Sequence, residues 1–117
     1  MTNPHLVCVG YDRQVLHSRA MVLRHAGFMV AEAFSLNGVL GLVKSDMVDA
    51  LLVCHSLSRE EQRKLIAEVR EERRLLPIIC VKEYDHELPH ARCIDAPNDP
   101  AELIDAVKLA LQLSPNA

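Results

Sequence analysis

Aromatic residues are scarce in this chain of 117 residues, which contains two phenylalanines, two tyrosines and no tryptophan. Single-stranded nucleic acids are usually bound by aromatic side chains that stack on the bases along a basic groove. A basic excess is absent as well, because the formal net charge is −3 and the pI is near 6.0. Nucleic-acid binding therefore has neither stacking nor electrostatic support in this sequence.

Long hydrophobic runs and paired cysteines are also absent. No apolar run approaches the roughly 20 residues that a transmembrane helix requires, and the start of the chain does not have the pattern of a signal peptide. The cysteines show no C-x-x-C spacing, and three of the four lie inside apolar runs. That pattern is typical of reduced, buried thiols. We therefore expect a cytoplasmic protein that does not associate with membranes and has no disulfide framework.

The residues that are present favour a single domain with a substantial core. Half of them are hydrophobic, which is enough to build a core without disulfides or a structural metal. The length is that of one ordinary domain. We expect one domain over residues 1–117, with a core from about residue 5 to residue 113.

Short apolar runs alternate with helical patterns along the chain. The predicted strands are His5–Val9, Phe28–Ala31, Asp49–Cys54, Pro77–Val81 and Cys93–Ile94. The predicted helices begin after the N-cap residues Asp12, Ser35, Ser58 and Asp99. Strands that alternate with helices and are joined by short loops predict a three-layer α/β fold with a parallel sheet.

The run Asp49–Cys54 is short, apolar and flanked by helical patterns, which predicts a strand buried on both faces. Ligands of open α/β sheets bind beyond the carboxyl ends of the strands. Cys54 and His55 are therefore placed where chemistry is expected. The helix N-termini nearby favour a thiolate at Cys54, although a cysteine at such a position is also an ordinary filler of a small apolar gap.

The order of these elements resembles that of the receiver domains of bacterial two-component response regulators, the CheY-like domains. The specific markers are Asp49 at the third strand, Pro77 at the fourth strand, and Pro97 with Asp99 and Pro100 before the last helix. The resemblance covers nearly the whole chain and implies a doubly wound, flavodoxin-like (βα)5 fold with five parallel strands in the order 2-1-3-4-5. The segment from Lys82 to Ala96 is shorter than usual for the family, so we expect the fourth helix to be shortened or lost.

The resemblance also implies a phosphorylation site, and this sequence departs from it at every position. Receiver domains accept a phosphoryl group on an aspartate, assisted by Mg²⁺ that carboxylates hold. This chain has Gly10 and Tyr11 at the positions of the family's acidic pair, and Cys54 at the position of the acceptor aspartate. The family also uses a hydroxyl residue after the fourth strand, an aromatic switch residue on the fifth strand and a lysine after the fifth strand. At those three positions this chain has Lys82, Cys93 and Ala96. A register shifted by one residue brings Asp12 and His55 to the site but still supplies only one carboxylate. The resemblance therefore implies a degenerate pseudo-receiver that takes no phosphate and needs no cofactor.

A metal site made of cysteine and histidine is not expected. The candidate ligands lie on or beside four different strands, whereas zinc sites use ligands paired at short spacing. Only Cys54 and His55 are adjacent, and neighbouring residues of a strand point to opposite faces. Lys82 either reaches toward Asp12 as an internal cation or is a solvated residue at the start of a loop.

Three functions stay open on the sequence. The leading hypothesis is a signalling domain without enzymatic activity that works through contact with a protein partner or a second copy, using an apolar patch on the first or last helix. The second is a small-ligand or thiol-based sensor that uses the space around Tyr11, Cys54 and Lys82, where the phosphorylation pocket of the family would be. The third is a functional phosphorelay receiver with an unusual acceptor residue.

Overall fold

The computed structural model describes residues 3–44, 48–53, 58–81, 93–96 and 100–112, with the backbone alone at residues 93–96 and 100. The strands are β1 (His5–Val9), β2 (Met29–Ala33), β3 (Ala50–Val53), β4 (Ile78–Val81) and β5 (Cys93–Ala96). The helices are α1 (Arg13–His25), α2 (Leu36–Val43), α3 (Arg59–Glu72) and α4 (Pro100–Gln112). Within these ranges no helix has the length and apolar character that crossing a membrane requires.

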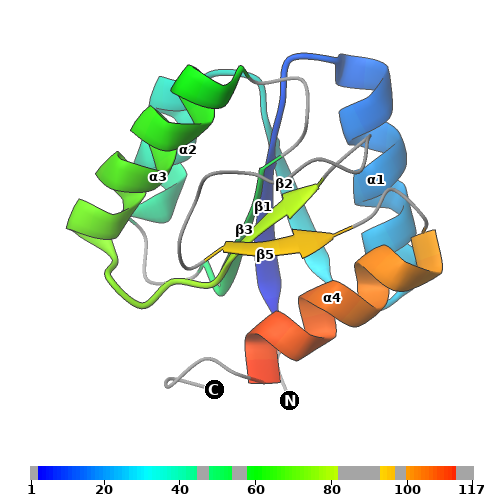
Figure 1. The fold of residues 1–117 in the computed structure, drawn as a ribbon. Coiled ribbons are helices and arrows are strands. Elements are labelled where there is room, and N and C mark those ends of the chain that lie inside the picture. The colour runs from blue at the N-terminus through cyan, green and yellow to red at the C-terminus, as the bar shows by residue number, and fades with distance from the viewer. Residues whose placement is uncertain (1–2, 45–47, 54–57, 82–92, 97–99, 113–117) are drawn as a thin grey trace.

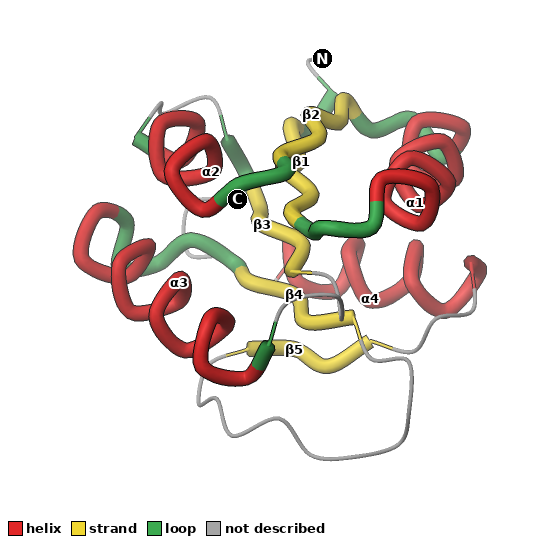
Figure 2. The backbone as a smooth tube through the Cα atoms, turned by 90° about the horizontal axis from the view of Figure 1, so that it is seen from above, coloured by secondary structure: helices red, strands yellow, loops and turns green. Residues whose placement is uncertain are grey.

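The strands form one sheet in which all neighbouring strands are parallel. Their order β2-β1-β3-β4 is the one that the sequence predicts, and β5 pairs with the outer side of β4. Helices α1 and α4 cover one face of the sheet, and α2 and α3 cover the other (Figures 1 and 2). The three-layer arrangement is therefore confirmed. The predicted shortening or loss of the helix between β4 and β5 concerns residues 82–92, which lie outside the described residues.

The core has two parts, one on each side of the sheet, because successive side chains of a strand point to opposite faces. On β3, Leu51 and Val53 belong to the cluster on the side of α2 and α3. Ala50 and Leu52 belong to the cluster on the side of α1 and α4. All four side chains are buried, which confirms that this central strand is covered on both faces.

Helix α1 begins and ends where the sequence predicts. The Asp12 carboxylate accepts a hydrogen bond from the Val15 backbone N–H at 3.2 Å and so caps the first turn. After the C-cap residue Ala26, Gly27 adopts a φ of 101°, a left-handed conformation that is readily available only to glycine.

Helices α2 and α3 are capped by the predicted serines. The Ser35 hydroxyl accepts a hydrogen bond from the Gly38 N–H at 3.1 Å. At the start of α3, Ser58 and Glu61 form a capping box in which each side chain accepts a backbone N–H of the other at 3.1 Å. Asp99, the cap predicted for the last helix, lies outside the described residues.

Strand β2 runs to Ala33, two residues beyond the predicted end at Ala31. The pairing with β1 continues there, because the Ala33 carbonyl accepts a hydrogen bond from the Gly10 N–H at 3.2 Å. The charged residue Glu32 interrupts the apolar pattern in the sequence, which is why the prediction ended early.

Glu32 belongs to a cluster that covers the outer side of β2, an edge strand. The first and last residues of β2 direct backbone groups toward β1, so Val30 and Glu32 direct theirs outward. Arg24 on α1 donates to the Val30 carbonyl at 2.8 Å and to the Glu32 carboxylate at 3.2 Å. The His17 Nδ1 atom also lies 3.2 Å from that carboxylate. We call Arg24, Glu32 and His17 the edge cluster.

Candidate functional site

The candidate site lies at the carboxyl edge of the sheet, between β1 and β3. These strands are neighbours, but β1 leads to α1 on one face and β3 leads to α3 on the other (Figure 2). The reversal makes this point the topological switch of the sheet, which is where open α/β folds bind their ligands. The described groups here are residues 10–13, which follow β1, and the first turn of α3.

A hydrogen bond joins the two sides of this site. The Tyr11 hydroxyl donates to the Glu61 carboxylate at 2.5 Å, although the two residues are 50 positions apart in the chain. The other oxygen of the same carboxylate accepts the Ser58 N–H at 3.1 Å. One glutamate therefore holds both the segment after β1 and the capping box of α3.

This contact shifts the pKa values of both partners. The hydrogen bond from Tyr11 is the main reason that the pKa of Glu61 lies below its ordinary value, and hydrogen bonds from the backbone and side chain of Ser58 add to the effect. The hydrogen bond to Glu61 raises the pKa of Tyr11. A lowered glutamate pKa stabilises the fold above the ordinary glutamate value, and a raised tyrosine pKa stabilises it below the ordinary tyrosine value. The pair is therefore intact between about pH 5 and pH 9.

The other predicted residues after β1, Gly10 and Asp12, have structural hydrogen bonds. Gly10 has no side chain, and its N–H bonds to the Ala33 carbonyl. Asp12, the carboxylate that a shifted register brings to the site, caps α1 through the Val15 N–H. Among the described residues, no three side chains of histidine, cysteine, aspartate or glutamate are grouped to hold a metal ion.

Sequence reasoning missed three participants at this edge. Glu61, three residues after the N-cap Ser58, fits a capping box in the sequence, and that local role hides its contact with Tyr11. The Arg13 guanidinium lies over the Phe34 ring, 4.5 Å from the ring centroid, an arrangement typical of a cation–π contact. Arg13 is a basic residue in the first turn of α1, where a positive charge is unfavourable next to the helix dipole. This unfavourable placement was the one sign in the sequence that Arg13 contacts another residue.

The remaining predicted positions are only partly described. Cys93 and Ala96 are the first and last residues of β5, and their backbones pair with Ile78 and Val81 of β4. Nothing is described of their side chains. The positions Cys54, His55 and Lys82 lie outside the described residues, so the space predicted between Tyr11, Cys54 and Lys82 is described only at Tyr11.

Cys8 and Cys80 are fully buried on β1 and β4, and burial keeps a thiol unreactive. We expect a thiol reagent in excess to modify at most two of the four cysteines in the native protein, at Cys54 and Cys93, and all four after denaturation. Peptide mapping of the labelled protein measures this. Native labelling of Cys8 or Cys80 would contradict the described packing.

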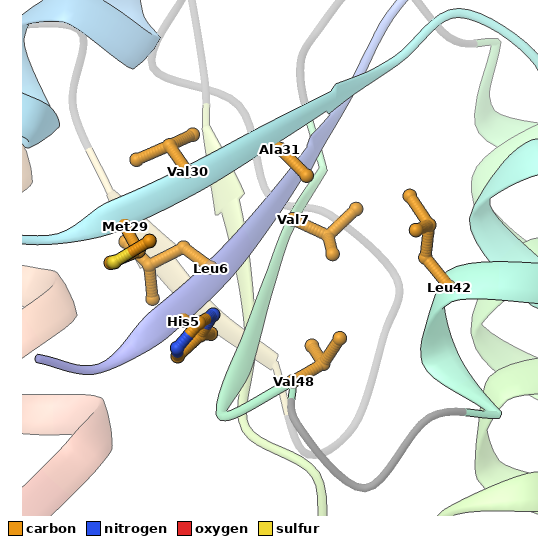
Figure 3. Close-up of a pocket in the computed structure, with 8 residues that line it drawn as sticks. All are labelled: His5, Leu6, Val7, Met29, Val30, Ala31, Leu42 and Val48. Carbon is orange, nitrogen blue, oxygen red and sulfur yellow. The ribbon is translucent and has the colours of Figure 1, made fainter. Parts of the chain in front are cut away.

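An apolar hollow of about 250 Å³ lies at the opposite end of the strands. Figure 3 shows its lining, which comes from the first residues of β1 and β2, from α2 and from the segment before β3. The lining residues are His5, Leu6, Val7, Met29, Val30, Ala31, Leu42 and Val48. The hollow is mostly hydrophobic and lies at the amino ends of β1 and β2, so it is separate from the site at Tyr11.

Comparison with solved structures identifies the fold. The chain is similar to a putative response regulator from Chloroflexus aurantiacus, with 24% identity, a TM-score of 0.83, and coverage of 95% of this chain and 99% of that one. It is also similar to a CheY-like receiver domain protein from Methanospirillum hungatei, with 19% identity, a TM-score of 0.79 and 95% coverage of both chains. A response regulator receiver protein from Sinorhizobium medicae gives 18% identity, a TM-score of 0.79, and coverage of 95% and 96%.

These identities are low, and no family profile and no curated protein matches the sequence. The agreement over almost the full length of each chain shows that the molecule has the fold of receiver domains. The fold predicted from the order of strands and helices is therefore supported by the structural comparison.

Proposed function

We propose that this chain is an atypical receiver-like signalling domain that is not phosphorylated and acts through protein–protein contact in the cytoplasm, without catalysing a reaction. The observation that carries the proposal is the hydrogen bond between Tyr11 and Glu61. Where receiver domains have an acidic pair for Mg²⁺, this chain has Gly10 and Tyr11, and the tyrosine hydroxyl donates to a carboxylate instead of supplying an anionic ligand.

The chemistry of phosphoryl transfer explains why this observation matters. The charge on the transferring group must be neutralised by a cation that is held by oxygen ligands. At this edge Asp12 accepts a hydrogen bond from Val15, and Glu61 accepts hydrogen bonds from Tyr11 and Ser58, while Glu60 in the same turn of α3 is exposed. A cation here would compete with these hydrogen bonds, and no three described histidine, cysteine, aspartate or glutamate side chains are grouped to hold it.

Output through protein contact is supported by large apolar side chains on the outer surfaces of two helices. Met21 on α1 is 42% exposed and Leu109 on α4 is 50% exposed. The sequence predicted an apolar patch on the first or last helix, and these residues lie on those helices. A protein partner or a second copy of the chain is the proposed binding partner.

Incubation with acetyl phosphate and Mg²⁺, followed at once by intact-mass spectrometry, tests the proposal. We expect no phosphoryl adduct, because neither the acceptor aspartate nor the acidic pair is present. A receiver domain with the complete set of aspartates, treated in parallel, is the positive control. A stable adduct on this chain would overturn the proposal, and its mapped position would show which residue acts as an unusual acceptor.

A further inference from the structure

The contact between Tyr11 and Glu61 joins two parts of the chain that the sheet itself does not connect at this point. Tyr11 lies two residues after the end of β1, and Glu61 is the third residue of α3. Strands β1 and β3 are paired along their length, but the helices that follow them, α1 and α3, lie on opposite faces of the sheet (Figure 1). The hydrogen bond therefore links the side of α1 to the side of α3 at the carboxyl edge of the sheet.

Glu61 is well suited to transmit this contact because its two oxygens have different partners. One accepts the Tyr11 hydroxyl and the other accepts the Ser58 N–H, while the Ser58 hydroxyl accepts the Glu61 N–H. The position of Tyr11 is thereby tied to the cap that starts α3. A hydrogen bond to an ionised carboxylate is stronger than one between neutral groups, and it is directional.

We propose that the hydrogen bond between Tyr11 and Glu61 is a latch that fixes the segment after β1 against the start of α3 in one conformation. The latch rests on the proposed function, because a site that takes no phosphoryl group does not need to open for a donor. It links, from within the chain, the segment after β1 to the first turn of α3.

Hydrogen exchange of single amides tests the latch. In Tyr11→Phe the ring is kept and only the hydroxyl is lost, so we expect the Glu61 and Gln62 amides in the first turn of α3 to exchange about two- to tenfold faster, the range for losing one net hydrogen bond. The Leu52 amide, in the central strand, exchanges through global unfolding, so its change measures the effect on overall stability, and the increase at Glu61 and Gln62 should exceed it. Equal exchange in the variant and the natural protein at Glu61 and Gln62 would overturn the proposal.

The pKa of Tyr11, measured by titration of the tyrosine absorbance, is a second readout. A loss of packing alone would not change this pKa. In a Tyr84→Phe background Tyr11 is the only tyrosine, and we expect it to titrate above its ordinary pKa. Glu61→Gln keeps a side chain that suits the capping box but lacks the charge, so the Tyr11 pKa should return toward its ordinary value. Glu60 is an exposed carboxylate in the same turn. Glu60→Gln is therefore the matched control, and it should leave the Tyr11 titration unchanged.

The outcomes separate the latch from the proposed function. If the natural protein takes no phosphoryl group but Tyr11→Phe leaves exchange and titration unchanged, the latch is wrong and the proposed function stands. If exchange and titration change as expected while acetyl phosphate does modify the natural protein, the latch stands as a contact and the proposed function is wrong.

Discussion

Leu103→Ala is expected to lower the free energy of unfolding by about 2–5 kcal/mol. Leu103 is 1% exposed and belongs to the cluster on the side of α1 and α4. Truncation removes buried apolar area and leaves a cavity that the surrounding close-packed side chains fill only in part. The loss is a large fraction of the stability of a domain of this size.

Leu109 on the same helix supplies a control with identical chemistry. It is 50% exposed, so Leu109→Ala should change the free energy of unfolding by no more than about 0.5 kcal/mol. Denaturation in urea, with equal slopes for both variants, measures the difference. If both substitutions had the same effect, the side of α4 that packs on the sheet would be assigned wrongly.

The second large effect on stability concerns two glycines at which an added methyl group should have opposite effects. Gly27→Ala is expected to destabilise the fold by about 1–2 kcal/mol, because the φ of 101° at this position is unfavourable for any residue with a Cβ. Gly41→Ala is expected to stabilise it by up to about 1 kcal/mol. Gly41 lies inside α2, and a Cβ added there meets no atom within 4 Å.

The same denaturation measurement decides this pair, because the two substitutions add the same methyl group and should shift the midpoint in opposite directions. Gly38→Ala gives an intermediate case. A Cβ at this position would lie 3.1 Å from the Ser35 hydroxyl oxygen that caps α2, so its gain should be smaller than that of Gly41→Ala. A shift in the same direction for Gly27→Ala and Gly41→Ala would contradict the described backbone.

Much of the fold follows from local signals that a single sequence carries. Asp12 and Ser58 predict helix starts because their side chains cap backbone amides only three residues further along the chain. The runs Leu6–Val9 of β1 and Ala50–Val53 of β3 are apolar because both of their faces are covered. Strand β2 was predicted less well, since an edge strand needs fewer apolar residues and Glu32 serves the edge cluster instead.

The candidate site was predictable only in what it lacks. The lack of a carboxylate at Gly10 and Tyr11 can be read directly from the order of residues after β1. The partner of Tyr11 cannot, because 50 positions separate it from Glu61 and the capping box already accounts for that glutamate. Contacts between segments brought together only by the sheet order leave no periodic trace in the sequence.

The edge cluster has a consequence for aggregation. An edge strand with open backbone groups is a template on which another chain can add a strand, and repeated addition leads to fibrils. Here the Arg24 guanidinium donates to the Val30 carbonyl, which points outward from the sheet, and it also donates to the Glu32 carboxylate. An incoming strand would have to displace a cation and bury an anion. Addition of a strand at the β2 edge is therefore disfavoured, and a second chain that approaches this edge meets side chains before it meets the backbone of β2.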